Sequence, residues 1–327
     1  KSLEIRKKTL PANHPLLAAS YNNIGGVYRS IGEYSKAFEY YEKSLEIMKE
    51  TLPVNHPDLA TAYNNIGTVY ASMGEYSKAL QYYEKSLEIK KKGLPANHPD
   101  FAQSYNNIGL VYDSMGKYSK ALEYYEKSLE IRKKTLSADH PDLATAYNNI
   151  GTVYASMGEY SKALEYYEKS LEIKKKGLPA NHSDFAQSYN NIGLVYYNMG
   201  EYSKTLEYYE KSFEIMKKTL PANHPLLATS YNNIGLVYKS MGDYSKAFEY
   251  YEKSLEIRKK TLSANHPDFA QSYNNIGLVY YSMGKYSKAL EYLARALDIY
   301  QRSLPPNHPN IINVKQGIEI VKRKLKV

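Results

Sequence analysis

The chain repeats itself every 42 residues, and this period restricts its fold more than any other feature. The pentapeptide Tyr-Asn-Asn-Ile-Gly occurs seven times at this spacing, beginning at residues 21, 63, 105, 147, 189, 231 and 273. At 327 residues the chain is longer than most single hydrophobic cores allow. A fixed period of about 20–50 residues is typical of a repeat array and not of unrelated domains. We therefore expect one continuous array over residues 1–327.

The second copy of the period, residues 56–97, predicts a helical hairpin. His-Pro-Asp at residues 56–58 is a helix start, because proline is tolerated in the first turn and aspartate favours the positive end of a helix. The first helix is expected to run to about residue 72, and Gly74 suits the left-handed position after it. A second helix should follow to about residue 92, where Gly93 and Pro95 stop it.

The whole chain is therefore expected to be all-α. Seven complete hairpins should occupy residues 15–302, after a partial second helix at residues 1–10. Residues 309–326 begin like a first helix but carry Lys-Gln-Gly where Tyr-Asn-Asn should stand, so we expect a capping helix. Because the chain begins inside a period and without methionine, we expect it to be a fragment of a longer protein.

Each helix of the hairpin has one apolar face. In the first helix the predicted buried stripe consists of Ala62, Tyr63, Ile66, Val69, Tyr70 and Met73, and in the second of Tyr76, Ala79, Leu80, Tyr83, Ser86, Leu87 and Ile89. A single hairpin cannot bury both faces, so neighbouring repeats must stack. Gly67 costs about 1 kcal/mol relative to alanine in a helix. We therefore expect it to allow close approach to Ala79 or Ser86 of the partner helix.

The opposite face of the first helix is polar and uncharged, and it supplies the candidate binding site. Its invariant asparagines are Asn22, Asn23, Asn64, Asn65, Asn106, Asn107, Asn148, Asn149, Asn190, Asn191, Asn232, Asn233, Asn274 and Asn275. An amide can donate to a peptide carbonyl and accept from a peptide N–H, so a row of amides can hold an extended peptide. A neighbouring position varies and could supply selectivity, as Arg29, Asp113, Tyr197, Lys239 and Tyr281. Alternatively, Asn65 and its equivalents bond across to the adjacent repeat.

These residues resemble a known repeat. The tetratricopeptide pattern of aromatic, Leu-Gly, Tyr, then Ala, aromatic and Ala is matched by Tyr63, Ile66, Gly67, Tyr70, Ala79, Tyr83 and Ser86. The 42-residue period with paired asparagines and Gly-Glu-Tyr-Ser-Lys-Ala-Leu is most similar to the kinesin light chain type. The resemblance implies a right-handed superhelical solenoid whose first helices line a concave groove for cargo peptides. Serine replaces the last alanine of the pattern everywhere except Ala296.

Other classes of function are disfavoured by composition. There is no cysteine, and the eight histidines occur one per period in a loop, so we expect no metal site, no cofactor and no enzyme. No run approaches the roughly 18 apolar residues of a membrane span, so we expect no membrane partner and a cytoplasmic location. The net charge of +9 comes largely from lysines where second helices end, such as residues 90–92, and a solvated edge there makes nucleic acid an improbable partner.

Two functions remain. The first is a scaffold that holds a protein or peptide ligand in the groove. The second is a structural spacer or a self-assembling array, since an unpaired end exposing Leu3 and Ile5 could drive self-association.

Overall fold

A computed structural model describes residues 2–326, and in this part of the chain every regular element is a helix. The predicted all-α class is confirmed. In chain order the helices are α1 (Ser2–Thr9), α2 (Pro15–Ser30), α3 (Tyr34–Thr51), α4 (Pro57–Ser72), α5 (Tyr76–Gly93), α6 (Pro99–Ser114), α7 (Tyr118–Thr135), α8 (Pro141–Ser156), α9 (Tyr160–Gly177), α10 (Ser183–Asn198), α11 (Tyr202–Thr219), α12 (Pro225–Ser240), α13 (Tyr244–Thr261), α14 (Pro267–Ser282), α15 (Tyr286–Ser303) and α16 (Pro309–Leu325). None of these helices is long and apolar enough to cross a membrane.

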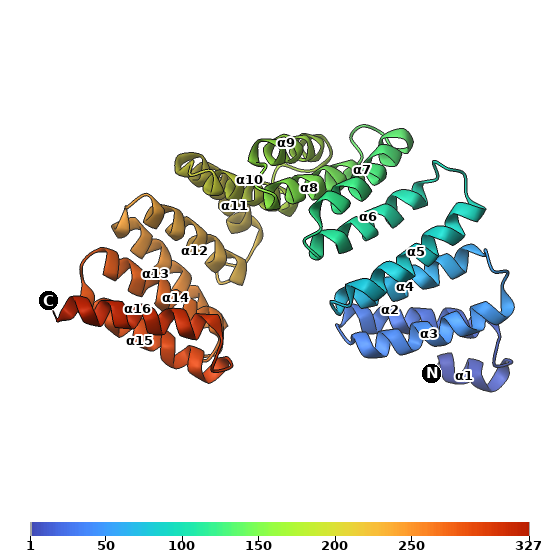
Figure 1. Ribbon diagram of the computed structural model, residues 1–327, viewed down its shortest axis with the longest axis horizontal. Helices are drawn as coiled ribbons and strands as arrows, with labels where there is room; N and C mark the ends of the chain where they lie inside the picture. Colours follow the sequence, from blue (N-terminus) through green and yellow to red (C-terminus); the bar gives the residue numbers. More distant parts are fainter. Residues whose placement is uncertain (1, 327) are drawn as a thin grey trace. The chain divides into compact units, whose positions relative to one another are not determined.

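The helices form two compact units, one ending at Gly177 and the other beginning at Leu178. The first unit contains α1 to α9 and the second α10 to α16. Within each unit a first helix of 16 residues pairs with a second helix of 18 residues, and successive pairs lie side by side (Figure 1). The first helices are α2, α4, α6, α8, α10, α12 and α14, and the second helices follow each of them.

The histidines begin the helices, as expected. In α4 the Nδ1 atom of His56 accepts the backbone N–H of Asp58 at 3.1 Å, directly before Pro57 in the first turn. All eight histidines make this bond, at 3.1 to 3.2 Å: His14, His56, His98, His140, His182, His224, His266 and His308. After the first helix Gly74 has φ of 76°, the left-handed conformation that glycine adopts at least cost. These two devices define one hairpin.

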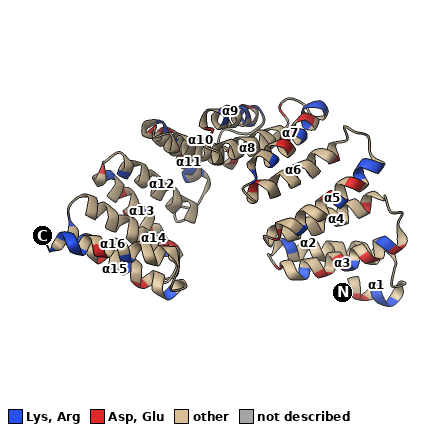
Figure 2. Ribbon diagram, in the orientation of Figure 1, with Lys and Arg blue, Asp and Glu red and all other residues tan. Residues whose placement is uncertain are grey.

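The predicted apolar stripes form the core. Ile66 and Val69 of α4 are fully buried, as is Ala79 of α5, and Tyr83 is nearly so. The prediction is wrong for Met73, which is 45% exposed, because the helix ends there and the residue becomes its C-cap. Charged side chains lie mainly on the second helices, which leaves the first helices largely uncharged (Figure 2).

The repeated glycine is required by a tyrosine of the partner helix. A Cβ atom on Gly67 would lie 2.8 Å from the ring of Tyr83 and 3.3 Å from the carbonyl oxygen of Ala79. The expected approach to Ala79 is therefore present. The other neighbour of Gly67 is Tyr83, and not Ser86 as expected. The buried tyrosine occupies the space that the missing side chain leaves.

Two adjacent glycines of α2 test this packing. A Cβ on Gly25 would lie 2.9 Å from the ring of Tyr41, whereas a Cβ on Gly26 would first meet the Tyr41 hydroxyl at 3.6 Å. Both substitutions with alanine gain the same helix propensity, about 1 kcal/mol. Overpacking costs about 1–3 kcal/mol, so Gly25→Ala should be less stable than Gly26→Ala by about that amount. Denaturant unfolding of the two variants measures the difference, and equal stabilities would contradict the packing role.

The two terminal helices, α1 and α16, pack on the hairpins next to them. α1 is short, and its Leu3 packs partly against Leu17 and Ala18, while Ile5 is 62% exposed. At the other end α16 buries four apolar residues in a core shared with α15: Ile311, Val314, Ile318 and Val321. This helix therefore packs on the last hairpin.

Candidate functional site

The paired asparagines lie on one side of the first helices and bond to one another between repeats. Asn65 Nδ2 donates to Asn22 Oδ1 at 3.0 Å, and Asn107 Nδ2 donates to Asn64 Oδ1 at 3.0 Å. The same bond joins Asn149 to Asn106 at 3.0 Å and Asn275 to Asn232 at 2.7 Å. In each unit, we call the surface formed by these residues and their equivalents the asparagine face.

The sequence predicts a ligand role for the whole row of asparagines, with a bond to the adjacent repeat as the alternative for Asn65 and its equivalents. Bonds between repeats are present, and each uses one residue of the Asn64 kind and one of the Asn65 kind. One amide-to-amide bond leaves a second donor hydrogen and further acceptor capacity on both residues. The ladder therefore links repeats and retains the capacity to bond a peptide.

The remaining asparagines are not all equivalent. Asn148 and Asn191 have partners of their own. Asn23 is exposed and Asn274 half-buried. Asn190 and Asn233 line a hollow in the second unit, and no hydrogen bond joins their amides within the described part of that unit.

The varying positions lie beside this ladder, and all of them are half-buried: Arg29, Asp113, Tyr197, Lys239 and Tyr281. Three of them, Arg29, Asp113 and Tyr197, lie close enough to the hydroxyls of buried tyrosines to affect their pKa. Tyr83 and Tyr167 reach this face, where their hydroxyls donate to Thr68 and Thr152 at 3.1 Å. Asp113 is close enough to Tyr125 and Tyr167 to raise the pKa of both hydroxyls, after the larger effect of their burial.

Two of these positions carry ionisable groups whose pKa is shifted by burial. Burial raises the pKa of the Asp113 carboxyl and lowers the pKa of the Lys239 ammonium. In both cases burial disfavours the charged form, and no nearby opposite charge offsets it. Within the described parts of their units, neither residue forms an ion pair. Tyr197 is different, since its hydroxyl lies 3.0 Å from Ser240 Oγ of the next first helix.

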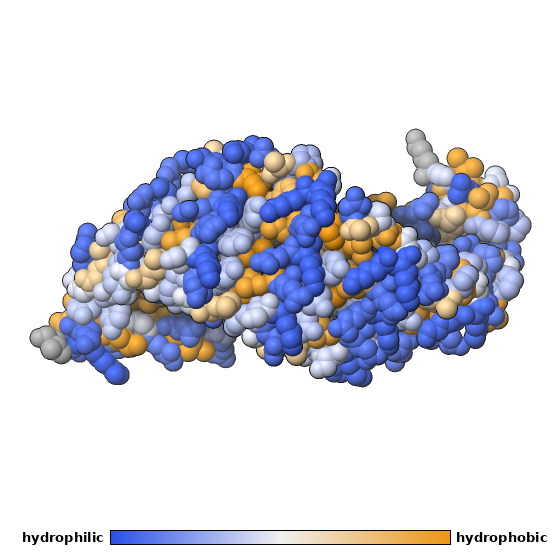
Figure 3. Space-filling view, turned by 90° about the horizontal axis from the view of Figure 1, so that it is seen from above, coloured by the Kyte–Doolittle hydropathy of each residue, from blue (hydrophilic) through white to orange (hydrophobic). Residues whose placement is uncertain are grey.

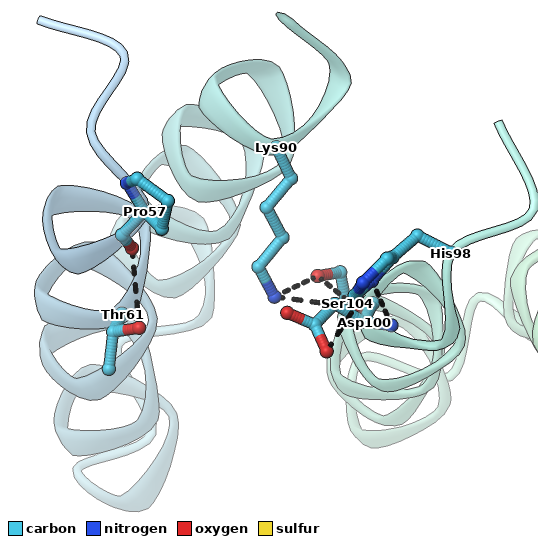
Figure 4. A network of polar contacts seen from close by, with 6 residues as sticks. All are labelled: Pro57, Thr61, Lys90, His98, Asp100 and Ser104. Carbon is cyan, nitrogen blue, oxygen red and sulfur yellow. Dashed lines mark hydrogen bonds and ion pairs between the residues drawn. The ribbon is translucent and has the colours of Figure 1, made fainter. Parts of the chain in front are cut away.

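A second contact between repeats involves a cation near the end of a second helix. Lys90 Nζ donates to Ser104 Oγ at 2.9 Å and to the carbonyl of Asp100 at 3.3 Å, both on the next first helix (Figure 4). Arg258 makes the corresponding bonds to the Asp268 carbonyl at 2.6 Å and to Ser272 Oγ at 2.9 Å. We call this contact the cation clamp.

The clamp corrects one expectation. The sequence placed Lys90 on a solvated edge, but the residue is half-buried and burial lowers its pKa. Lys92 does remain exposed, and it pairs with Glu88 at 2.9 Å. A sequence signal for the clamp exists, because a cation and a serine recur fourteen residues apart at Arg6 and Ser20, Lys90 and Ser104, Lys174 and Ser188, and Arg258 and Ser272.

The repeat period also matches a known family. A family model described as tetratricopeptide repeat matches residues 1–50, 37–92, 100–176 and 184–260, and a second model with the same description matches residues 269–310. The chain belongs to the tetratricopeptide repeat family. No curated protein matches it.

Solved structures include tetratricopeptide arrays of the predicted type. A Podosopora anserina protein assigned to the kinesin light chains, with nearly identical TPR-like repeats, is 26% identical, with a TM-score of 0.57 over 63% of this chain and 97% of the other. BtubC (BKLC) from P. vanneervenii is 23% identical, with a TM-score of 0.58 over 71% and 91%. The apo form of RapI is 19% identical, with a TM-score of 0.69 over 88% and 78%. The last two similarities show the fold alone, and the first agrees with the kinesin light chain-like assignment.

The serine that departs from the tetratricopeptide pattern has a structural role. Ser86 is buried in α5, and its hydroxyl donates to the carbonyl of Ala60 in α4 at 2.7 Å. Alanine at this site, as in the family pattern and at Ala296, would fill the same space without the bond. The serine thus adds a hydrogen bond within each of the six tetratricopeptide hairpins that carry it.

No group of three or more histidine, aspartate or glutamate residues within residues 2–326 could hold a metal ion. The histidines are occupied at the helix starts, where Nδ1 already accepts a backbone N–H. The asparagine face therefore offers hydrogen bonding by its amides and ion pairing by a few half-buried charged groups.

Proposed function

We propose that the chain is a protein-interaction scaffold that holds an extended peptide along the asparagine face. Membership of the tetratricopeptide family supports a scaffold in general. The observation that carries the peptide proposal is the pair of half-buried charges beside the ladder, Asp113 and Lys239.

These charges are costly without a ligand. Desolvation of a charged group costs free energy unless an opposite charge or hydrogen bonds replace the lost water. Burial shifts the pKa of Asp113 and Lys239 toward their neutral forms, and neither forms an ion pair in the described part of its unit. A bound cationic group near Asp113, or an anionic group near Lys239, would recover this cost. The variation from Arg29 to Asp113 to Lys239 then selects the ligand's sequence.

The ladder would supply contacts that do not depend on sequence. Asn64 and Asn107 use one donor and one acceptor on each other, which leaves hydrogen-bonding capacity directed away from that bond. Peptide groups of an extended chain offer the complementary N–H and C=O. On the face drawn in Figure 3, apolar surface forms narrow bands between hydrophilic rows.

The second candidate function is a structural spacer without a peptide ligand. It is favoured by the same amide bonds, since they join neighbouring repeats. A spacer, however, gains nothing from unpaired half-buried charges. The two functions therefore differ in what removal of the asparagines does to binding.

The test removes four amides at once. Short peptides are selected from a displayed random library against the full chain, and their affinity is measured for the variant with Asn64, Asn106, Asn148 and Asn190 all changed to alanine. Each lost hydrogen bond is worth about 0.5–1.5 kcal/mol, so binding should weaken at least about tenfold. Thermal unfolding of the same variant should shift only modestly, because better helix propensity offsets the lost links.

The matched control changes four exposed glutamates of the second helices, Glu84, Glu126, Glu168 and Glu210, to glutamine. This control should leave the affinity of the selected peptides within about twofold, because exposed charges contribute little. If the asparagine variant unfolds markedly earlier while its peptide affinity is unchanged, the amides serve the spacer function and the peptide proposal fails.

A further inference from the structure

One contact between repeats in the second unit is built differently from the others. At the clamp position α11 carries Met216 in place of lysine or arginine. The partner serine is retained, and Ser230 Oγ lies 3.8 Å from the Met216 sulfur, a weak contact. The chain's other methionine at this position, Met48, has alanine, Ala62, at the serine position, so both polar groups of the clamp are replaced there.

The amide ladder is also interrupted at this place. The bond that joins Asn275 to Asn232 has no counterpart between Asn233 and Asn190 in the described part of the second unit. Ser230 is only half-buried, whereas the equivalent residues are all buried: Ser20, Ala62, Ser104, Ala146, Ser188 and Ser272. Both observations show a gap between α10 and α12 at this position, although Tyr197 and Ser240 join the two helices near their C-terminal ends.

A cavity of about 400 Å³ occupies the opening. Met216 of α11 and Leu220, which directly follows that helix, line it together with Ala186 of α10 and Leu226 of α12. Leu226 is half exposed at 52% and stands where most repeats have aspartate. Around these apolar groups lie hydrogen-bonding side chains, namely Gln187, Asn190, Thr229 and Asn233.

We propose that this cavity binds a single aliphatic or thioether side chain of the peptide that crosses the asparagine face. The inference rests on the proposed function and adds a specificity site to it. The volume lies within the roughly 300–1,000 Å³ of small-ligand pockets. An apolar interior with amides around it matches a leucine or methionine side chain whose flanking peptide groups bond to Asn190 and Asn233.

The charge of the cavity argues for the same occupant. Two substitutions remove the charges that most other repeats carry here, a cation at Met216 and a carboxylate at Leu226. Asp184 is the one charged residue in the lining, and it lies 3.5 Å from His182 at the helix start. A glutamate side chain entering beside Met216 would lose water without gaining a counter-charge, because the charge of Asp184 has the same sign. An aliphatic side chain loses nothing of this kind and gains burial.

The experiment uses a minimal probe, N-acetyl-leucine methylamide, which has one aliphatic side chain and two peptide groups. It is titrated into the full chain with labelled methyl groups, and the signals of Leu226 are followed by NMR. They should shift saturably with this probe and not with the glutamate analogue. Met216→Arg, which restores the clamp residue, should weaken the affinity of the probe at least about tenfold, because the arginine side chain takes the place in which the leucine side chain would be buried.

Two further variants make the result decisive. Met48→Arg places the same substitution at the equivalent position of α3 and should leave the Leu226 response unchanged. Leu226→Asp restores the usual acid on the cavity wall and, with the methyl signals of Leu220 followed instead, should weaken probe binding as Met216→Arg does. Thermal unfolding reports whether each variant is folded. The inference is overturned if the probe leaves Leu226 unaffected, or if folded Met216→Arg protein responds as the parent does. Because the probe is not a long peptide, it can bind even if the asparagine variant shows that the peptide proposal is wrong.

Discussion

Between pH 10 and pH 12 the protein is expected to lose its helical structure, because its core contains a tyrosine in almost every repeat. These buried residues are Tyr41, Tyr83, Tyr125, Tyr167, Tyr209 and Tyr251. Burial raises the pKa of all six above the ordinary value of 10.0, and for Tyr209 to about 12. Circular dichroism against pH, beside the absorbance of tyrosinate, measures the transition.

The loss of stability above pH 10 follows from proton linkage. A tyrosine with a raised pKa in the folded state ionises first in the unfolded chain, so its contribution is complete below pH 10 and is lost as the pH rises through the folded pKa. For Tyr209 alone, a shift from 10.0 to about 12 corresponds to about 3 kcal/mol. Lys90 and Lys239 act in the opposite direction. Their lowered pKa means that stability rises as the pH approaches 10.5, but these two cannot offset six tyrosines.

The control keeps the rings and removes the ionisable groups. Tyr41, Tyr125, Tyr209 and Tyr251 lack the threonine partner that Tyr83 and Tyr167 have, so phenylalanine at these four sites preserves the packing. Leu293 shows that the last repeat already uses an apolar residue at this position. The variant should unfold at a higher pH than the parent. Coincident alkaline transitions would show that the buried tyrosines do not determine the limit.

Much of the fold could be predicted because it depends on local chemistry. The first helix predicted to run to about residue 72 ends at Ser72, where Gly74 with φ of 76° stops it. The helix starts depend on histidine and proline, which act on the next two residues only. Met73 was assigned to the core from helical periodicity, and the assignment failed where the helix ends and the periodicity no longer applies.

The site was less predictable because it depends on distances between repeats. The face of Asn64 could be assigned from its position on the helix, but its bond to Asn107 depends on how closely α4 and α6 approach. The same is true of Lys90, whose sequence neighbours suggest a solvated helix end and whose bond to Ser104 lies on another helix. The interruption at Met216 is recognisable only by comparison with the clamps of Lys90 and Arg258, which the structure shows and the sequence alone does not.

Two adjacent isoleucines of α16 provide the last prediction. Ile311 is 1% exposed and belongs to the core that also contains Leu293 and Tyr300 of α15, whereas Ile312 is 45% exposed. Truncation of a buried isoleucine to alanine costs about 2–5 kcal/mol through lost burial and the cavity left behind. A surface substitution usually changes stability by less than about 0.5 kcal/mol.

Ile311→Ala should therefore destabilise the end of the second unit, while Ile312→Ala serves as a control of the same chemistry in the same helix turn. Because each repeat contacts only its neighbours, the loss should be concentrated in α15 and α16. Hydrogen exchange of backbone amides resolves this, and faster exchange in α15 is expected for Ile311→Ala alone. If both variants exchange alike, α16 does not stabilise α15. The increase in exchange rate should be smaller in α13 than in α15, because stacked helical pairs transmit stability from one neighbour to the next.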